Sequence, residues 1–80
     1  MNGINENELA TGVRKAINGY LNDLDGEKPS HIHAMVIHCV EKPLLEIVIQ
    51  HTQGNQTQAA ELLGINRNTL RNKMKQYQIK

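Results

Sequence analysis

Positive charge is concentrated at the C-terminal end of the sequence, where it could bind phosphate groups. Residues 67–80 contain five of the nine Lys and Arg residues and none of the eight Asp and Glu residues. A helix over this stretch would carry polar residues on one face, namely Arg67, Asn68, Arg71, Asn72 and Lys75. A positive end on a mildly negative body is typical of a protein that presents that end to a polyanion. A solvated helix face without a partner is the alternative interpretation.

Histidine and cysteine side chains between residues 31 and 39 form the only grouping that could bind a metal ion. Its members are His31, His33, His38 and Cys39. Side chains two residues apart on a helix point to different faces, so four ligands from one helix cannot converge. We therefore expect no metal site and no cofactor. Cys39 is interpreted as a small core residue, and the histidines as partly exposed.

Residues arranged for catalysis are not recognisable in the sequence. It contains no nucleophile–base pair, no paired-carboxylate site and no Gly-rich phosphate loop, so we do not expect an enzyme. The single cysteine excludes an internal disulfide and is typical of a reducing cytoplasm. No apolar run approaches the length that spans a membrane. A cytoplasmic protein is the expected class.

Two short helices joined by a tight turn are predicted for residues 54–77. Asn55 can cap the first helix through its side-chain oxygen, and Asn66 can cap the second in the same way. Gly64 is expected to end the first helix, because glycine adopts a left-handed backbone without strain. Apolar residues at helical spacing give each helix an inward face, comprising Ala59, Ala60 and Leu63 in the first and Leu70, Met74 and Tyr77 in the second.

Three residues in this stretch have the spacing of a helix-turn-helix. A small residue at Ala60 lets the two helices touch, Gly64 makes the turn, and Leu70 buries the second helix. Arg67 and Lys73 are both expected to face away from the core. The alternative interpretation is a helical hairpin that merely exposes a charged face.

Two longer helices are predicted ahead of this motif, after a flexible N-terminus at residues 1–7. The first is expected to be capped by Asn5, with Glu8 as its capping-box partner, and its apolar face continues to Leu24. Ser30 is expected to cap the second helix, which would run to about Thr52 and would be roughly 33 Å long.

The second of these helices carries more apolar residues than one partner helix could cover. Its apolar stripe passes Pro43 without a change of phase, which favours one kinked helix over two separate helices. The predicted dimer core is Val36, Cys39, Val40, Pro43, Leu44, Ile47 and Val48, and the stripe is widened by Ile37, Leu45 and Ile49. An 80-residue chain cannot bury both flanks of such a helix. We therefore expect residues 8–52 to form a homodimer with a four-helix core.

The stretch EKPLLEIVIQHTQGNQTQAAELLGINRNTLRNKMKQY closely resembles the Fis family of small bacterial nucleoid-associated proteins. The similarity covers Val13 to Tyr77 and includes the mid-helix proline and the blocks GNQT and LGIN followed by Arg67. It implies an all-α fold with four helices per chain, assembled as an intertwined homodimer. It also implies a transcriptional regulator of the nucleoid that binds degenerate sites in two successive major grooves of double-stranded DNA and bends the duplex.

The resemblance also implies particular DNA contacts. Arg67 is similar to the residue that reads a guanine, with Asn66 beside it in the groove, and an Arg–guanine contact is the commonest direct readout. The implied backbone contacts are Asn55, Thr57, Thr69, Arg71 and Lys73, and Lys75 joins them on the charged face. Positions where family members are often basic are here Gln58, Asn72 and Gln76. We therefore expect a shallower salt dependence and weaker non-specific binding.

Several alternatives stay open at the level of sequence. The same fold forms the C-terminal domain of many sigma-54-dependent activators, although a chain that begins at Met1 without an ATPase or receiver domain favours a stand-alone protein. Longer relatives carry an N-terminal β-hairpin arm that stimulates DNA recombinases, and this chain has few residues there. A recombinase or RNA polymerase as a further partner is therefore left open. A helical protein-interaction module with an incidental basic tail is the alternative from a different functional class.

Overall fold

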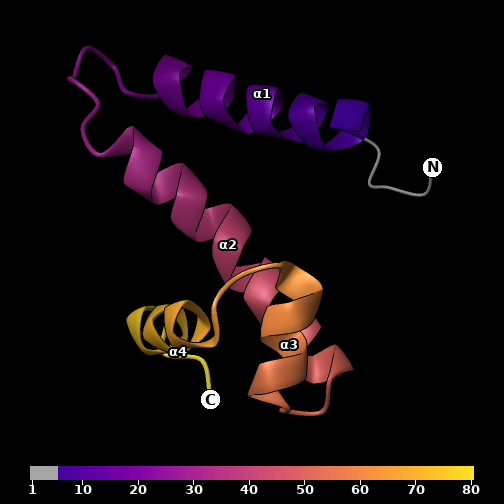
Figure 1. Cartoon of the computed structure of the whole chain (residues 1–80). Helices are drawn as coiled ribbons and strands as arrows, with labels where there is room; N and C mark the ends of the chain where they lie inside the picture. The colour runs from indigo at the N-terminus through magenta and orange to yellow at the C-terminus, as the bar shows by residue number, and fades with distance from the viewer. Residues whose placement is uncertain (1–5) are drawn as a thin grey trace. The chain divides into compact units, whose positions relative to one another are not determined.

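The computed structural model describes residues 6–80, and within this range the chain consists of helices joined by turns (Figure 1). The helices are α1 (Glu6–Asn22), α2 (Ile32–His51), α3 (Gln56–Leu63) and α4 (Arg67–Gln76). The predicted all-α class with four helices per chain is confirmed. The chain divides into two compact units, one that ends at His31 and one that begins at Ile32.

The first unit contains α1 and the turn that follows it. The helix ends at Asn22, two residues before the predicted end at Leu24. Asp25 (φ 53°) and Gly26 (φ 88°) have left-handed backbones, which cannot continue a right-handed helix. The predicted cap at Asn5 lies outside the described residues.

The second unit begins with α2, which starts later than predicted. His31 has a left-handed backbone (φ 59°), so the helix begins at Ile32 and Ser30 lies ahead of it rather than at its cap. The helix ends at His51, one residue before the predicted end. It continues through Pro43, which confirms one helix over two separate helices.

Opposite faces of α2 have different surroundings. Leu45 and Ile49 are 1% and 6% exposed, because α3 and α4 pack against this face. At about 3.6 residues per turn, Val40 and Ile47 lie on the other side of the helix, and both are exposed. Leu45 and Ile49, which were predicted only to widen the dimer stripe, instead form part of the core within the chain.

The predicted dimer core is mostly uncovered by the chain itself. Its exposed members are Cys39, Val40, Pro43, Leu44 and Ile47, and its half-buried members are Val36 and Val48. Val48 packs against the intrachain core. Cys39 is exposed in the single chain, so the interpretation of this thiol as a core residue does not hold within one copy. Burial of the stripe requires a partner surface.

The helices of the second unit end in a common way, which sets the directions of the connecting turns. A left-handed residue follows each helix closely, at Gln53 (φ 56°), Gly64 (φ 74°) and Gln78 (φ 57°). The next N–H then bonds back to a carbonyl of the last helical turn: Gly54 to Ile49 at 3.0 Å, Ile65 to Ala60 at 3.1 Å, and Ile79 to Met74 at 2.8 Å. These bonds satisfy carbonyls that the helix leaves free. The two isoleucines then pack against the core.

Candidate nucleic-acid interface

Asparagine caps determine where α3 and α4 begin. The side-chain oxygen of Asn55 accepts a hydrogen bond from the backbone N–H of Gln58 at 3.0 Å, and that of Asn66 accepts from Asn68 at 2.7 Å. Each bond satisfies a first-turn N–H that has no partner within its helix. Both predicted caps are confirmed.

Small side chains bring α3 into contact with α4. Ala59 and Ala60 are buried on α3, and they share one core with Leu70 and Met74 of α4. Gly64 makes the turn between the helices with its left-handed backbone. The close contact, the turn and the buried second helix are those that the spacing of Ala60, Gly64 and Leu70 predicts. The helix-turn-helix is confirmed in geometry.

The inward packing of α4 leaves its polar side free. Leu70, Met74 and Tyr77 are buried, so the exposed residues of this helix lie away from the core: Arg67, Asn68, Thr69, Arg71, Asn72, Lys75 and Gln76. Asn55 and Thr57 are exposed at the start of α3, and Asn66 is exposed at the turn. Of the residues predicted to contact DNA, Lys73 is the one that is partly covered.

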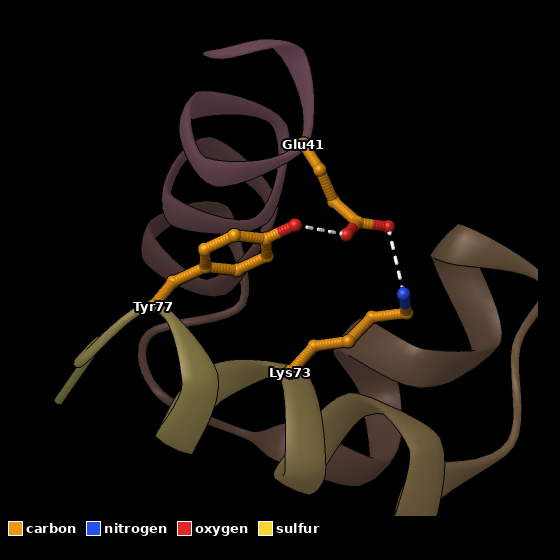
Figure 2. Close-up of polar contacts among 3 residues, drawn as sticks. All are labelled: Glu41, Lys73 and Tyr77. Atoms are coloured by element: carbon orange, nitrogen blue, oxygen red, sulfur yellow. Dashed lines mark hydrogen bonds and ion pairs between the residues drawn. The ribbon is translucent and has the colours of Figure 1, made fainter. Parts of the chain in front are cut away.

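Lys73 is held by a carboxylate of α2 (Figure 2). Its Nζ lies 3.0 Å from Oε2 of Glu41, and the two side chains are 30% and 23% exposed. The hydroxyl of Tyr77 donates to the other oxygen, Oε1, at 2.5 Å. Lys73 lies outside the buried core, as expected, but its ammonium group points back to α2.

The pKa values of the acidic groups follow from these contacts. The hydrogen bond from Tyr77 lowers the pKa of Glu41, and the hydrogen bond from Lys73 lowers it further, because both stabilise the carboxylate. The same carboxylate raises the pKa of Tyr77. It accepts a hydrogen bond from the neutral phenol, and its negative charge disfavours the phenolate. Glu41 is therefore ionised and Tyr77 neutral at physiological pH.

Two further polar residues support the helix-turn-helix from α2 and from the turn after it. The rings of His38 and Tyr77 meet edge to face, with centroids 4.8 Å apart. The buried hydroxyl of Thr52 lies 3.1 Å from the carbonyl of Ile49 and 3.2 Å from that of Asn55, and its proton is shared between them. The hydroxyl thereby ties the end of α2 to the cap of α3.

Sequence reasoning missed these supporting residues, although α2 carries a signal for them. A second stripe runs along this helix and just past its end at spacings of three and four: His38, Glu41, Leu45, Ile49 and Thr52. It is polar at both ends and apolar in the middle. The larger apolar stripe on the opposite side overlaps with it in hydrophobic spacing. The spacing alone therefore does not distinguish the face that supports α4.

Metal and membrane sites find no support within the described part of the chain. Over that part, no three His, Cys, Asp or Glu side chains come together in a way that could hold a metal ion. His31, His33, His38 and Cys39 do not form a shared site there. Among the described helices, none is both long enough and apolar enough to cross a membrane.

The sequence of the second unit matches a known family. A profile described as the Fis family of bacterial regulatory proteins matches residues 38–77, which is half of the chain. The chain belongs to the Fis family. The matched range includes the helix-turn-helix and also Glu41, Lys73 and Tyr77, so the family pattern covers the supporting contacts as well as the exposed face of α4.

Curated Fis proteins are similar over most of the chain. A protein of Psychromonas ingrahamii named DNA-binding protein Fis is 49% identical over 74 residues, which cover 92% of this chain and 75% of the relative. A protein of Glaesserella parasuis with the same name is 49% identical over 69 residues, which cover 86% of this chain and 70% of the relative. The resemblance inferred from the sequence motifs is confirmed.

Proposed function

We propose that the chain binds double-stranded DNA by placing α4 in the major groove, as the second helix of a helix-turn-helix does. The observation that carries the proposal is the division of α4 into two sides. Its apolar residues are buried, while the cations Arg67, Arg71 and Lys75 are exposed together. Membership of the Fis family and relatives named as DNA-binding proteins support it. The protein then acts as a nucleoid-associated transcriptional regulator in the bacterial cytoplasm, not as an enzyme.

The exposed residues divide into two roles in this proposal. Arg67, in the first turn of α4, reads a guanine, with Asn66 beside it in the groove. The remaining contacts position the protein on phosphate groups and carry no sequence information. They are Asn55, Thr57, Thr69, Arg71 and Lys75.

The DNA-binding unit acts as a homodimer in this proposal. The stripe on α2 that includes Val40, Leu44 and Ile47 is exposed in one copy, and a second copy of the same stripe would cover it across a two-fold axis. Leu9 and Leu21 give α1 exposed apolar residues as well, so α1 completes a four-helix core. Residues 8–52 thus dimerise, and residues 54–77 bind DNA.

The duplex bends when both subunits bind it. Successive major grooves of straight DNA lie about 34 Å apart, and the Fis resemblance implies a closer spacing of the two α4 helices. Bending a site of this size costs on the order of 1–6 kcal/mol, depending on the bases deformed. Affinity should therefore be higher for A·T-rich than for G·C-rich centres when the flanking guanines are fixed. Equal affinity for the two kinds of centre, with gel mobilities that show no bend, would mean that the two α4 helices are spaced for straight DNA.

Titration of a labelled duplex at several salt concentrations tests the DNA-binding proposal. Arg71→Ala should weaken binding and reduce the salt slope by about 0.9 for each phosphate that the protein no longer neutralises. Arg14→Ala removes the same charge from α1 and is the matched control, so it should change both quantities little. Equal losses in the two variants would mean that net charge, rather than α4, attracts DNA. Wild-type protein that binds no duplex would favour a protein-interaction module.

A further inference from the structure

Lys73 differs from the other cations of α4 in how it is held. Its ammonium group forms an ion pair with Glu41, and the side chain is 30% exposed. Lys75 lies two residues further along the same helix, is exposed, and has no ion pair among the described residues. The two lysines therefore carry the same charge on the same turn of α4, but Lys73 is paired and Lys75 is not.

We propose that Glu41 is a positioning residue that withholds Lys73 from DNA phosphate. Each subunit then binds one phosphate fewer than the number of cations on α4 would allow. The inference rests on the proposed function, because it concerns how strongly the same α4 surface binds DNA. It separates Lys73 from the group of backbone contacts that the family resemblance implies.

The geometry around Glu41 makes the lysine difficult to release. The other oxygen of the carboxylate accepts a hydrogen bond from the hydroxyl of Tyr77, which fixes its orientation. The ring of Tyr77 in turn packs edge to face against His38. Lys73 would have to leave an oriented, ionised partner to reach a phosphate group. Its departure would leave Glu41 with an uncompensated negative charge beside a polyanion, and like charges repel. The ion pair is therefore favoured over a phosphate contact in the complex.

Removing the charge of Glu41 while keeping its hydrogen bond with Tyr77 tests the inference. Glu41→Gln leaves a carbonyl oxygen that can accept the proton of Tyr77, but it no longer pairs with the ammonium group. Lys73 then becomes available, so duplex binding should tighten and the salt slope should steepen. Neutralising one further phosphate corresponds to an extra decrease of about 3.5-fold in affinity between 50 and 200 mM salt for each subunit.

The double variant Glu41→Gln/Lys73→Gln decides between withholding and ordinary contact. If the pair binds no phosphate, removing both charges should return affinity and salt slope to wild-type values. Lys75→Gln is the matched control and should reduce the slope by about 0.9 per subunit. A double variant whose slope falls as much as that of Lys75→Gln would overturn the inference, because Lys73 would then contact DNA despite Glu41.

The single variant Lys73→Gln isolates the charge of Glu41, because it leaves that carboxylate without its ion pair. Repulsion from DNA should then lower affinity below that of the wild type, and the double variant should restore it. A double variant that binds as weakly as Lys73→Gln would contradict the proposal. Thermal melting of each variant identifies those that are folded at the titration temperature. If the wild type binds DNA in a salt-dependent way and Glu41→Gln has the same affinity and salt slope, this inference alone is overturned. Wild-type protein without any duplex binding would remove the proposed function and the inference together.

Discussion

Asn55 and Asn66 each combine a role in folding with one in the proposed recognition of DNA. Their side-chain oxygens accept the capping hydrogen bonds of α3 and α4. Each amide nitrogen still carries two donors that can reach a DNA group. Folding and recognition therefore use different atoms of the same side chain. Lys73 differs from these residues, because its ammonium group is already paired with Glu41.

Arg67→Ala should relax sequence preference without unfolding the protein. Arg67 is exposed in the first turn of α4 and contributes nothing to the core, so the melting temperature should stay at the wild-type value. Loss of a bidentate guanine contact should cost about 1–3 kcal/mol on duplexes that contain this guanine. Titration of two duplexes that differ only at this base measures the effect. Equal weakening on both would assign Arg67 to the DNA backbone.

The contact between Glu41 and Tyr77 should make folding stability depend on pH at both extremes. The pKa of Glu41 is lowered in the folded protein, so its contribution is present above the ordinary carboxyl pKa and is lost as pH falls through the lowered value. The pKa of Tyr77 is raised, so its contribution is present below the ordinary phenol pKa and is lost as pH rises through the raised value.

Urea unfolding of the wild type and of Tyr77→Phe across the pH range tests this linkage. The free energies of unfolding should differ most near neutral pH, and the difference should shrink towards both acid and alkaline pH. A difference that stays constant at every pH would mean that the hydroxyl stabilises the fold independently of the ionisation of Glu41 and Tyr77, and no difference at any pH would mean that Tyr77 acts through its ring alone.

At the scale of elements, sequence patterns predicted local features and missed distant ones. The caps at Asn55 and Asn66 and the turn at Gly64 involve residues within a few positions of one another, so composition and spacing identify them. Tyr77 lies 36 residues from Glu41, and no local pattern connects the two. The start of α2 was predicted too early, because Ser30 is a favourable cap and nothing in the sequence indicated that His31 adopts a left-handed backbone.

The two faces of α2 show why its packing was only partly predictable. Both faces are apolar near the middle of the helix, and hydrophobic spacing cannot tell which face meets α3 and α4. The position of the following turn decides it, because the chain reverses after His51 and brings Ala59 and Leu70 against Leu45. The sequence indicates that α2 has more apolar surface than one chain can bury, and the structure identifies the face of α2 on which it is left exposed.

Substitutions at two helix C-termini should differ in their effects on stability. Gly64 has a left-handed backbone, and a Cβ at this position would meet only open space, so Gly64→Ala should destabilise the fold by about 1–2 kcal/mol through backbone strain alone. Gln53 occupies the corresponding left-handed position after α2, and Gln53→Gly should relieve similar strain and stabilise the fold or leave it unchanged. Chemical denaturation measures both. Destabilisation by both variants would mean that the side chain of Gln53 makes a stabilising contact.

At the scale of the whole molecule, the proposed dimer predicts that two similarly exposed apolar residues respond differently to charge. Ile47 on α2 is 65% exposed and Leu62 on α3 is 59% exposed in the single chain. Ile47→Asp would bury an unpaired charge in the dimer core and should leave little folded protein. Leu62→Asp is the matched control and should melt near the wild-type temperature. Wild-type melting should also rise with protein concentration.

Sedimentation distinguishes this dimer from a stable single chain. Folding and association form one equilibrium in the proposal, so the folded protein should sediment as a dimer. A folded wild-type monomer at micromolar concentration, or an Ile47→Asp variant as stable as Leu62→Asp, would contradict the assignment of the α2 stripe to a subunit interface.

DNA cleavage from a tethered reagent tests whether two α4 helices enter successive major grooves of one duplex. An iron chelate would be attached at Asn72→Cys on the exposed face of α4, in a Cys39→Ala background. The matched control carries it at Glu46→Cys, an exposed position of α2. We expect two clusters of strand breaks about one helical turn apart, with much weaker cleavage from the control position. Cleavage that is uniform along the duplex, or equal from the two positions, would contradict it.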